Sequence, residues 1–158
     1  MEKKYTHANL MRTNLWLGDA VAANDRGFLH ENNIGLVVNC TKEIATPSFY
    51  SDDGIMSIRL PLNNYNMAEN LDTIRRLVDD IENKVNDALQ QGVTVLIHCA
   101  QGRHRSAAVV AYHLMKRKKW NYDYTKKYML QRRPVVFYPY DPFFTFLNDT
   151  YNYYNYYN

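Results

Sequence analysis

The sequence predicts an α/β fold, with a central and largely parallel β-sheet flanked by helices. Short runs of β-branched residues alternate with longer segments of helical periodicity, which is typical of β-α-β units. The chain has 158 residues, of which 46% are hydrophobic and 22% charged, so it can bury one compact core. We therefore expect a single domain over residues 1–158, and we interpret the low-complexity Tyr/Asn segment at 151–158 as a short extension rather than a docking segment.

Four segments have the composition of strands. The run 93–97 (VTVLI) is the most strand-like of them, and the run 34–40 (IGLVVNC) is short enough for a buried parallel strand. Segment 14–19 (NLWLGD) has the pattern of a short strand that ends in a turn, and segment 55–60 stops at Pro61. These four segments are the predicted sheet.

Helical periodicity marks the segments around these strands. Apolar residues recur at intervals of three and four from Leu71 to Leu89, and Gly92 suits the C-terminal cap of that helix. Residues 41–54 carry Pro, Asp and Gly in turn patterns and are predicted as a loop. The shorter predicted helices cover 20–33, 106–119, 121–132 and 141–151.

The net charge of +3 is unevenly distributed along the chain. Residues 1–98 hold 9 Lys and Arg against 13 Asp and Glu, a net charge of −4, whereas residues 99–158 hold 10 against 3, a net charge of +7. This asymmetry suggests an anionic partner, although a solvated basic face has the same composition.

Composition also excludes several classes of protein. No segment approaches the roughly 20 consecutive apolar residues of a membrane span, and residues 1–10 are too polar for a secretory signal. Cys40 and Cys99 are too few for a disulfide scaffold and lack the spacing of a structural zinc site. We therefore expect a cytoplasmic protein, and the excess of Asn and Tyr suggests an AT-rich genome such as that of a virus acting in a host cell.

The segment 98–106 (HCAQGRHRS) joins the 93–97 strand to the 106–119 helix. At such a junction successive backbone N–H groups point at one spot, and the start of the helix adds partial positive charge, so the loop suits an anion. The amides, the helix dipole and Arg105 favour ionisation of the Cys99 thiol, which then becomes a nucleophile near neutral pH.

Other side chains of this loop complete the predicted site. Gly102 lets the backbone turn sharply, and Arg105 can hold two phosphate oxygens in fork geometry. Ser106 can donate a hydrogen bond to the Cys99 thiolate and so ease its departure from a covalent intermediate.

Two alternatives remain open for this segment from residue types alone. Cys99 can be a buried structural cysteine beside a solvent-facing basic turn. His98, Cys99 and His104 can instead bind a metal ion, although their spacing suits no common zinc pattern.

The segment HCAQGRHRS is similar to the H-C-x5-R-S/T signature of the cysteine-dependent phosphatases, and residues 12–147 resemble their small dual-specificity branch. The similarity extends over LWLGD, IGLVVNC, IRLPLNN, VLIHC, AVVAYHLM and QRRP. It implies the α/β fold of these enzymes and a two-step mechanism, in which Cys99 attacks phosphorus and water then releases phosphate. It also implies phosphorylated proteins as substrates, phosphotyrosine and phosphoserine or phosphothreonine alike in a shallow pocket, with neither metal nor cofactor.

The resemblance assigns a role to each residue of the loop. Cys99 is the nucleophile, Arg105 binds phosphate, and Ser106 and His98 tune the thiol. The implied phosphate-binding cradle consists of Ala100, Gln101, Gly102, Arg103, His104 and Arg105.

One residue departs from the family pattern. The resemblance places an Asp that acts as general acid where this sequence has Asn64, and Asn cannot donate that proton. Glu69 and Asp72 are nearby carboxylates that could serve, although both also suit the N-terminus of the following helix. A phosphoanhydride leaves as a phosphate with a pKa of about 6 and hardly needs the acid, whereas a tyrosine leaving group with a pKa near 10 gains from protonation.

Arg103 and His104 make the loop unusually basic. The sequence GRHRS resembles the GKHRT of the fungal and plant branch that acts on inositol pyrophosphates, and related enzymes that cleave RNA 5′-triphosphates also lack the acid. Phosphoanhydride or phosphoinositide hydrolysis is therefore the alternative activity, and only the RNA reaction would involve nucleic acid. A solvent position at the rim accounts for both residues equally well.

A pseudo-phosphatase that binds phosphorylated partners without turnover is the third hypothesis. Asn64 favours it, whereas the intact Cys99 and Arg105 oppose it.

Cys40 is a candidate for redox regulation. It ends a predicted parallel strand at the sheet edge where active sites form in open α/β folds, so we expect it near Cys99, where it could trap the oxidised nucleophile as a disulfide. A buried cysteine without a redox role is the alternative.

Overall fold

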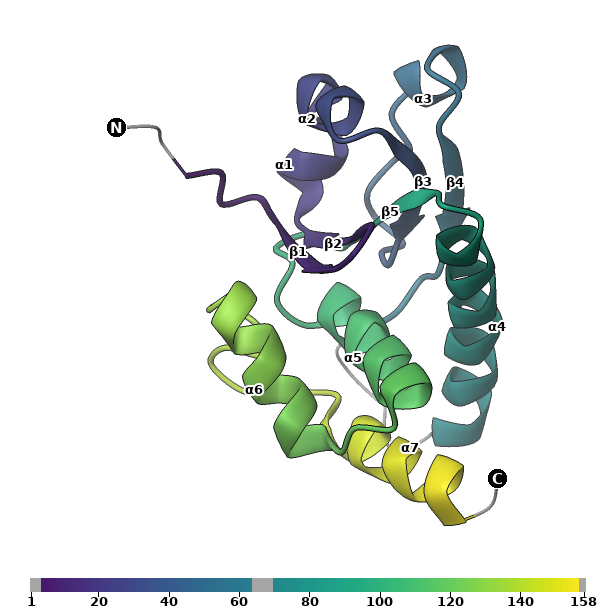
Figure 1. The fold of residues 1–158 in the computed structure, drawn as a ribbon, viewed down its shortest axis with the longest axis vertical. Helices are drawn as coiled ribbons and strands as arrows, with labels where there is room; N and C mark the ends of the chain where they lie inside the picture. The colour runs from purple at the N-terminus through teal and green to yellow at the C-terminus, as the bar shows by residue number, and fades with distance from the viewer. Residues whose placement is uncertain (1–3, 64–69, 157–158) are drawn as a thin grey trace.

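The computed structural model describes residues 4–63 and 70–156. The sheet in this part of the chain has the strand order β1-β2-β5-β3-β4 (Figure 1). Its strands are β1 (Ala8–Arg12), β2 (Leu15–Gly18), β3 (Ile34–Asn39), β4 (Met56–Arg59) and β5 (Thr94–His98). β2, β5, β3 and β4 run parallel, whereas β1 pairs antiparallel with β2 at one edge. The predicted α/β fold with a largely parallel sheet is confirmed.

Helices cover both faces of the sheet (Figure 1). One face carries the short helices α1 (Ala20–Ala23), α2 (Arg26–Glu31) and α3 (Phe49–Asp52). The other face carries α4 (Leu71–Gln90), α5 (Arg105–Lys118), α6 (Tyr122–Arg132) and α7 (Phe144–Tyr156). α5 lies at the centre of this second layer, and each of its residues from Ser106 to Met115 is buried. Because α5 follows the predicted catalytic loop directly, that loop is anchored in the larger of the two cores.

A buried polar network joins α4 to α5. Glu82 accepts a hydrogen bond from His113 Nδ1 at 2.8 Å, and Arg117 Nη2 approaches its other oxygen at 2.7 Å. The side chains of Glu82 and His113 are fully buried. Burial alone would raise the pKa of Glu82, but the hydrogen bonds from His113 and Arg117 lower it overall, so the carboxylate is held in its charged form.

The structure corrects the helix predicted over 20–33. The Asp25 side chain accepts a hydrogen bond from the Phe28 amide at 3.0 Å and caps a new helix, so α1 ends at Ala23 and α2 begins at Arg26. Three other segments differ from the prediction: β1 is an additional edge strand, α3 lies inside the predicted loop 41–54, and α7 continues through Tyr156 into the segment expected to be an extension.

The parallel strands place three connections at one edge of the sheet. Gly18 at the end of β2 and Asn39 at the end of β3 both pair with His98 at the end of β5. The residues that follow these strands are Asp19, Cys40 and Cys99. The active site predicted from the sequence therefore lies where the carboxyl ends of the parallel strands meet.

Candidate active site

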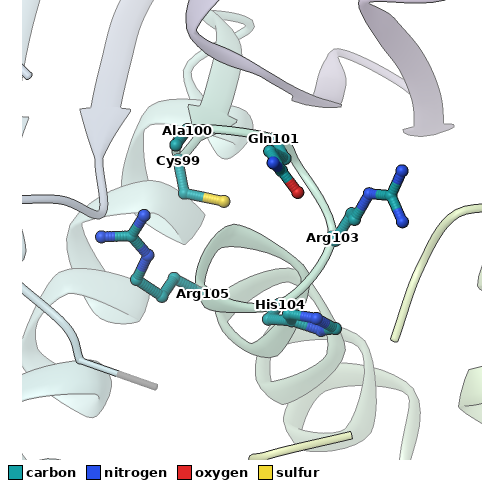
Figure 2. A pocket seen from close by; sticks show the side chains of 6 residues that line it. All are labelled: Cys99, Ala100, Gln101, Arg103, His104 and Arg105. Carbon is teal, nitrogen blue, oxygen red and sulfur yellow. The ribbon is translucent and has the colours of Figure 1, made fainter. Parts of the chain in front are cut away.

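The loop between β5 and α5 curves around a hollow of about 230 Å³ (Figure 2). The residues that line the hollow are Cys99, Ala100, Gln101, Arg103, His104 and Arg105. Gly102 has a φ of 65°, and a Cβ atom there would lie 2.6 Å from the Gly18 carbonyl oxygen. Glycine is therefore required at this turn for both conformation and space.

The Cys99 sulfur points into the hollow (Figure 2). Its Sγ lies 3.0 Å from Ser106 Oγ, and the residue is 3% exposed. Burial alone would raise the pKa of the thiol, but hydrogen bonds from the Ser106 hydroxyl and from the Ser106 and Gly102 amides, with the charge of Arg105, lower it overall. The contact predicted between Ser106 and the thiol is present in the structure.

Arg105 begins α5, and its guanidinium lies on the side of the hollow opposite Arg103 (Figure 2). Its Nη1 donates a 2.8 Å hydrogen bond to Glu43, whose side chain is 56% exposed. The same hydrogen bond lowers the pKa of Glu43. Glu43 was not predicted as a site residue, because it lies in a loop far from Arg105 in sequence and only the sheet topology brings the two together.

Arg103 and His104 flank the hollow on the side away from the sulfur (Figure 2). The Arg103 guanidinium lies 5.9 Å from the ring centroid of Tyr138, and the His104 ring stacks on Tyr140 at 5.7 Å. Burial and the charges of Arg103 and Arg105 lower the pKa of His104, which favours a neutral imidazole near pH 7. Aromatic partners thus hold both residues at the rim.

His98 and Cys40 lie beneath the loop. His98 is buried, and its Nδ1 lies 3.2 Å from the Cys99 carbonyl oxygen, so the contact is with the backbone. Burial also lowers the pKa of His98. The Cys40 amide donates to the His98 carbonyl at 2.8 Å, so Cys40 and Cys99 lie side by side just after the ends of the neighbouring strands β3 and β5. Burial and the nearby Cys99 raise the pKa of the Cys40 thiol, so Cys40 remains protonated.

Of the positions considered for the general acid, the structure describes Asp72 alone. Asn64 and Glu69 lie outside the described residues. Asp72 lies in the first turn of α4, where its side chain is 85% exposed and approaches Arg75 Nη1 at 3.4 Å. This position suits a residue at a helix N-terminus, and Asp72 is absent from the described lining of the hollow.

Most of the chain, the catalytic loop included, matches a known family. The model of the family "Dual specificity phosphatase, catalytic domain" matches residues 15–153. The chain belongs to the dual specificity phosphatase family. The resemblance to this family inferred from the sequence is confirmed.

Individual relatives support the same assignment. Rat dual specificity protein phosphatase 18 is 32% identical over 122 residues, which cover 77% of this chain and 56% of that protein. Human dual specificity protein phosphatase 16 is 28% identical over 140 residues, which cover 89% of this chain and 20% of that protein. The match thus spans less than two thirds of either relative. A crystal structure of a mouse putative dual specificity phosphatase complexed with zinc tungstate has a TM-score of 0.81 at 24% identity, and covers 96% of this chain and 91% of that chain.

The described helices include none that is long and apolar enough to cross a membrane.

Proposed function

We propose that this phosphatase hydrolyses phosphotyrosine and phosphoserine or phosphothreonine in proteins through a cysteinyl-phosphate intermediate. One observation carries the proposal: a thiol whose pKa is lowered and the Arg105 side chain line the same hollow, and the Ser106 hydroxyl lies 3.0 Å from the sulfur. The reacting sulfur, the groups that bind phosphate and a hydroxyl for the sulfur thus converge on one spot. This arrangement suits nucleophilic displacement at phosphorus.

In the first step the loop amides and Arg105 bind the phosphate oxygens. The Cys99 thiolate forms an S–P bond as the bond from phosphorus to the ester oxygen breaks, and the leaving oxygen takes a proton from an acid. Glu43 accepts a hydrogen bond from one of the five N–H groups of Arg105, so the other donors can bind phosphate while this ion pair persists. Glu43 therefore orients Arg105 without competing for all of its donors.

In the second step water attacks phosphorus and the S–P bond breaks, which releases inorganic phosphate and returns the Cys99 thiolate. Ser106 Oγ donates to the departing sulfur and so stabilises its negative charge. We assign a tuning role to His98 as well, through its contact with the Cys99 carbonyl.

Glu69 and Asp72 remain the proposed general acids, and Asp72 would have to reach the hollow from the exposed first turn of α4. Asn64, at the position where the family has its acid, favours a second candidate function, hydrolysis of phosphoanhydrides or phosphoinositides by the same residues. Anhydride substrates fit because their leaving group needs little protonation, and Arg103 at the rim adds positive charge for further phosphates.

The proposed substrates are phosphorylated proteins, which such an enzyme meets in the cytoplasm. A reducing compartment keeps Cys99 as a thiol, so the cytoplasm also suits the chemistry. Under the second function the substrate is an inositol pyrophosphate, a phosphoinositide or an RNA 5′-triphosphate.

We also infer that Cys40 can protect the nucleophile. Peroxide oxidises the Cys99 thiolate to a sulfenic acid, and attack by the Cys40 sulfur then forms a disulfide and releases water. The pairing of β3 with β5 supports a disulfide between Cys40 and Cys99, because residues side by side at the ends of neighbouring strands lie within the Cα separation that a disulfide needs. A Cys40→Ser variant that loses activity to peroxide as slowly and as reversibly as the parent would contradict this role.

The proposed function is tested by phosphate release at pH 6 to 7 from four substrates. They are a phosphotyrosine peptide, a phosphothreonine peptide, an inositol pyrophosphate and a 5′-triphosphate RNA, with Cys99→Ser as the blank. Turnover of both peptides supports the protein phosphatase, whereas turnover of the anhydrides alone would support the second function. Phosphopeptide binding without release from any substrate would indicate a pseudo-phosphatase.

A further inference from the structure

Arg133 is a buried cation beside the catalytic loop that the mechanism above does not use. It follows α6 and is 3% exposed. Its guanidinium donates to four acceptors, and none of the four is a carboxylate. Nε donates to the Gly102 carbonyl at 2.9 Å and Nη2 to the Gln101 carbonyl at 3.1 Å, while Nη1 donates to the Thr6 carbonyl and the Asn9 side chain.

The other loop carbonyls are also held from outside the loop. The Ala20 amide donates to the Ala100 carbonyl at 3.1 Å, and the Phe137 amide donates to the Arg103 carbonyl at 2.8 Å. Together with Arg133, these contacts hold each carbonyl from residue 100 to residue 103. These four carbonyls are therefore all hydrogen-bonded, and Arg133 holds the two central ones.

The planarity of the peptide bond connects this outer surface to the hollow. In a trans peptide the carbonyl of one residue and the N–H of the next point in opposite directions. Arg133 holds the Gln101 carbonyl, and the N–H at the other end of that peptide, on Gly102, bonds to the Cys99 sulfur. By the same rule, a fixed Gly102 carbonyl directs the Arg103 N–H inward.

Only an arginine matches this geometry. The planar guanidinium presents its Nε and Nη2 donors side by side, and here they reach two consecutive carbonyls. A lysine at this position would keep the charge but would act as a point donor. The close fit is visible at Gly102, where a Cβ atom would lie 2.7 Å from Arg133 Nη2.

We propose that Arg133 is a positioning residue that aims the N–H groups of Gly102 and Arg103 at the thiolate and the bound phosphate by holding the opposite ends of the same two peptides. The consequence for phosphate binding rests on the proposed function, whereas the consequence for the Cys99 thiolate does not. The Arg133 guanidinium hydrogen-bonds to the carbonyls of the loop and not to the Cys99 sulfur, although its charge also interacts favourably with the Cys99 thiolate. Its bonds to Thr6 and Asn9 also tie the loop to the N-terminal strand.

The test compares Arg133→Met and Arg133→Lys with the matched control Arg132→Met. Arg132 is the neighbouring residue, but its guanidinium lies 3.5 Å from the Tyr128 ring centroid and bonds to the Tyr128 carbonyl instead of the loop. Two readouts need no turnover: the pH dependence of iodoacetamide alkylation of Cys99, followed by mass spectrometry of its peptide, and the affinity for orthovanadate.

We expect Arg133→Met to move the alkylation midpoint upward by about one pH unit, which is a tenfold loss of thiolate below the midpoint. We expect the same variant to bind orthovanadate at least tenfold more weakly than the parent. The midpoint and the affinity of Arg133→Lys should lie between those of the parent and Arg133→Met, and those of Arg132→Met should equal the parent's. A folded Arg133→Met with the parent's midpoint and orthovanadate affinity overturns the proposal. If circular dichroism shows that Arg133→Met does not fold, the alkylation midpoint and the orthovanadate affinity of Arg133→Lys test the proposal instead, and parent values for both overturn it.

Failure of the proposed function gives a different result. A parent protein that releases no phosphate from phosphopeptides refutes that function, while the alkylation profiles still decide whether Arg133 directs the loop amides. In an active parent, Arg133→Met raises KM and lowers kcat together, because both the bound phosphate and the thiolate depend on the same amides. Arg132→Met leaves both constants unchanged.

Discussion

Replacing Ser106 by alanine tests how the site stabilises its nucleophile. The hydroxyl lies 3.0 Å from the Cys99 sulfur in a position where Ser106 is fully buried. A hydrogen bond to a charged group contributes about 1.5 to 3 kcal/mol, and one pKa unit corresponds to 1.36 kcal/mol. Because the Ser106 and Gly102 amides and Arg105 remain, we expect the smaller part of that range, an upward shift of the Cys99 pKa by roughly one unit.

The sign of the pH effect follows from the reactive form. Cys99 attacks as a thiolate, so kcat/KM rises with pH through the pKa of the thiol, and Ser106→Ala moves that rising limb upward. The pH dependence of iodoacetamide alkylation measures the same shift in the free protein. Ser106→Thr keeps a hydroxyl and serves as the matched control, with a profile close to the parent's.

Ser106→Ala also slows the release of phosphate from sulfur. We expect a burst of leaving group followed by a slower steady state, since the thiolate departs without its hydrogen bond. Stopped-flow detection with an aryl phosphate measures both phases. An Ser106→Ala protein with the parent's alkylation midpoint and no burst would refute the role assigned to the hydroxyl.

Three further variants test the fold and the loop. Glu82→Ala leaves the buried His113 and the partly buried Arg117 without their carboxylate, and should lower the free energy of unfolding by about 3 to 5 kcal/mol in urea titrations. Because folding lowers the pKa of Glu82, its contribution is full above the unfolded-state pKa and disappears as pH falls through the folded-state value; a parent protein with no loss of stability over that acid range would contradict this. Glu43→Gln should reduce kcat/KM about twofold to fivefold through a less ordered Arg105, with no change in the alkylation midpoint above a few tenths of a pH unit; an unchanged kcat/KM would show that the ion pair is dispensable. Gly102→Ala should abolish turnover and cost about 1 to 3 kcal/mol in urea titrations, because φ is positive and the Gly18 carbonyl leaves no room; an active, stable variant would show that the loop tolerates another conformation.

The fold was largely predictable because its pattern is local. The run 93–97 and the periodicity from Leu71 to Leu89 predicted β5 and α4, since buried parallel strands and amphipathic helices have distinct spacings. The edge strand β1 was missed because ANLMR shows no clear alternation and depends on its pairing with β2. The break between α1 and α2 depends on a single cap at Asp25, which periodicity alone does not reveal.

The site was predictable where its residues are contiguous. The position of Cys99 in its loop and its contact with Ser106 follow from one short segment between a strand and a helix. Glu43 and Arg133 could not be assigned from the sequence, because they lie far from the loop along the chain and reach it only after folding. The QRRP segment is part of the resemblance, but the contacts of its Arg133 depend on carbonyl directions that no sequence pattern shows.

Direct detection of phosphate on Cys99 tests the central claim. Parent, Ser106→Ala and Cys99→Ser proteins are mixed with a phosphotyrosine peptide, quenched in acid within the first turnovers, digested and analysed by mass spectrometry. We predict phosphate on the peptide that carries Cys99, more of it in Ser106→Ala because the second step is slower, and none in Cys99→Ser. Turnover by the parent with no phosphorylated Cys99 in either the parent or Ser106→Ala would contradict the covalent mechanism.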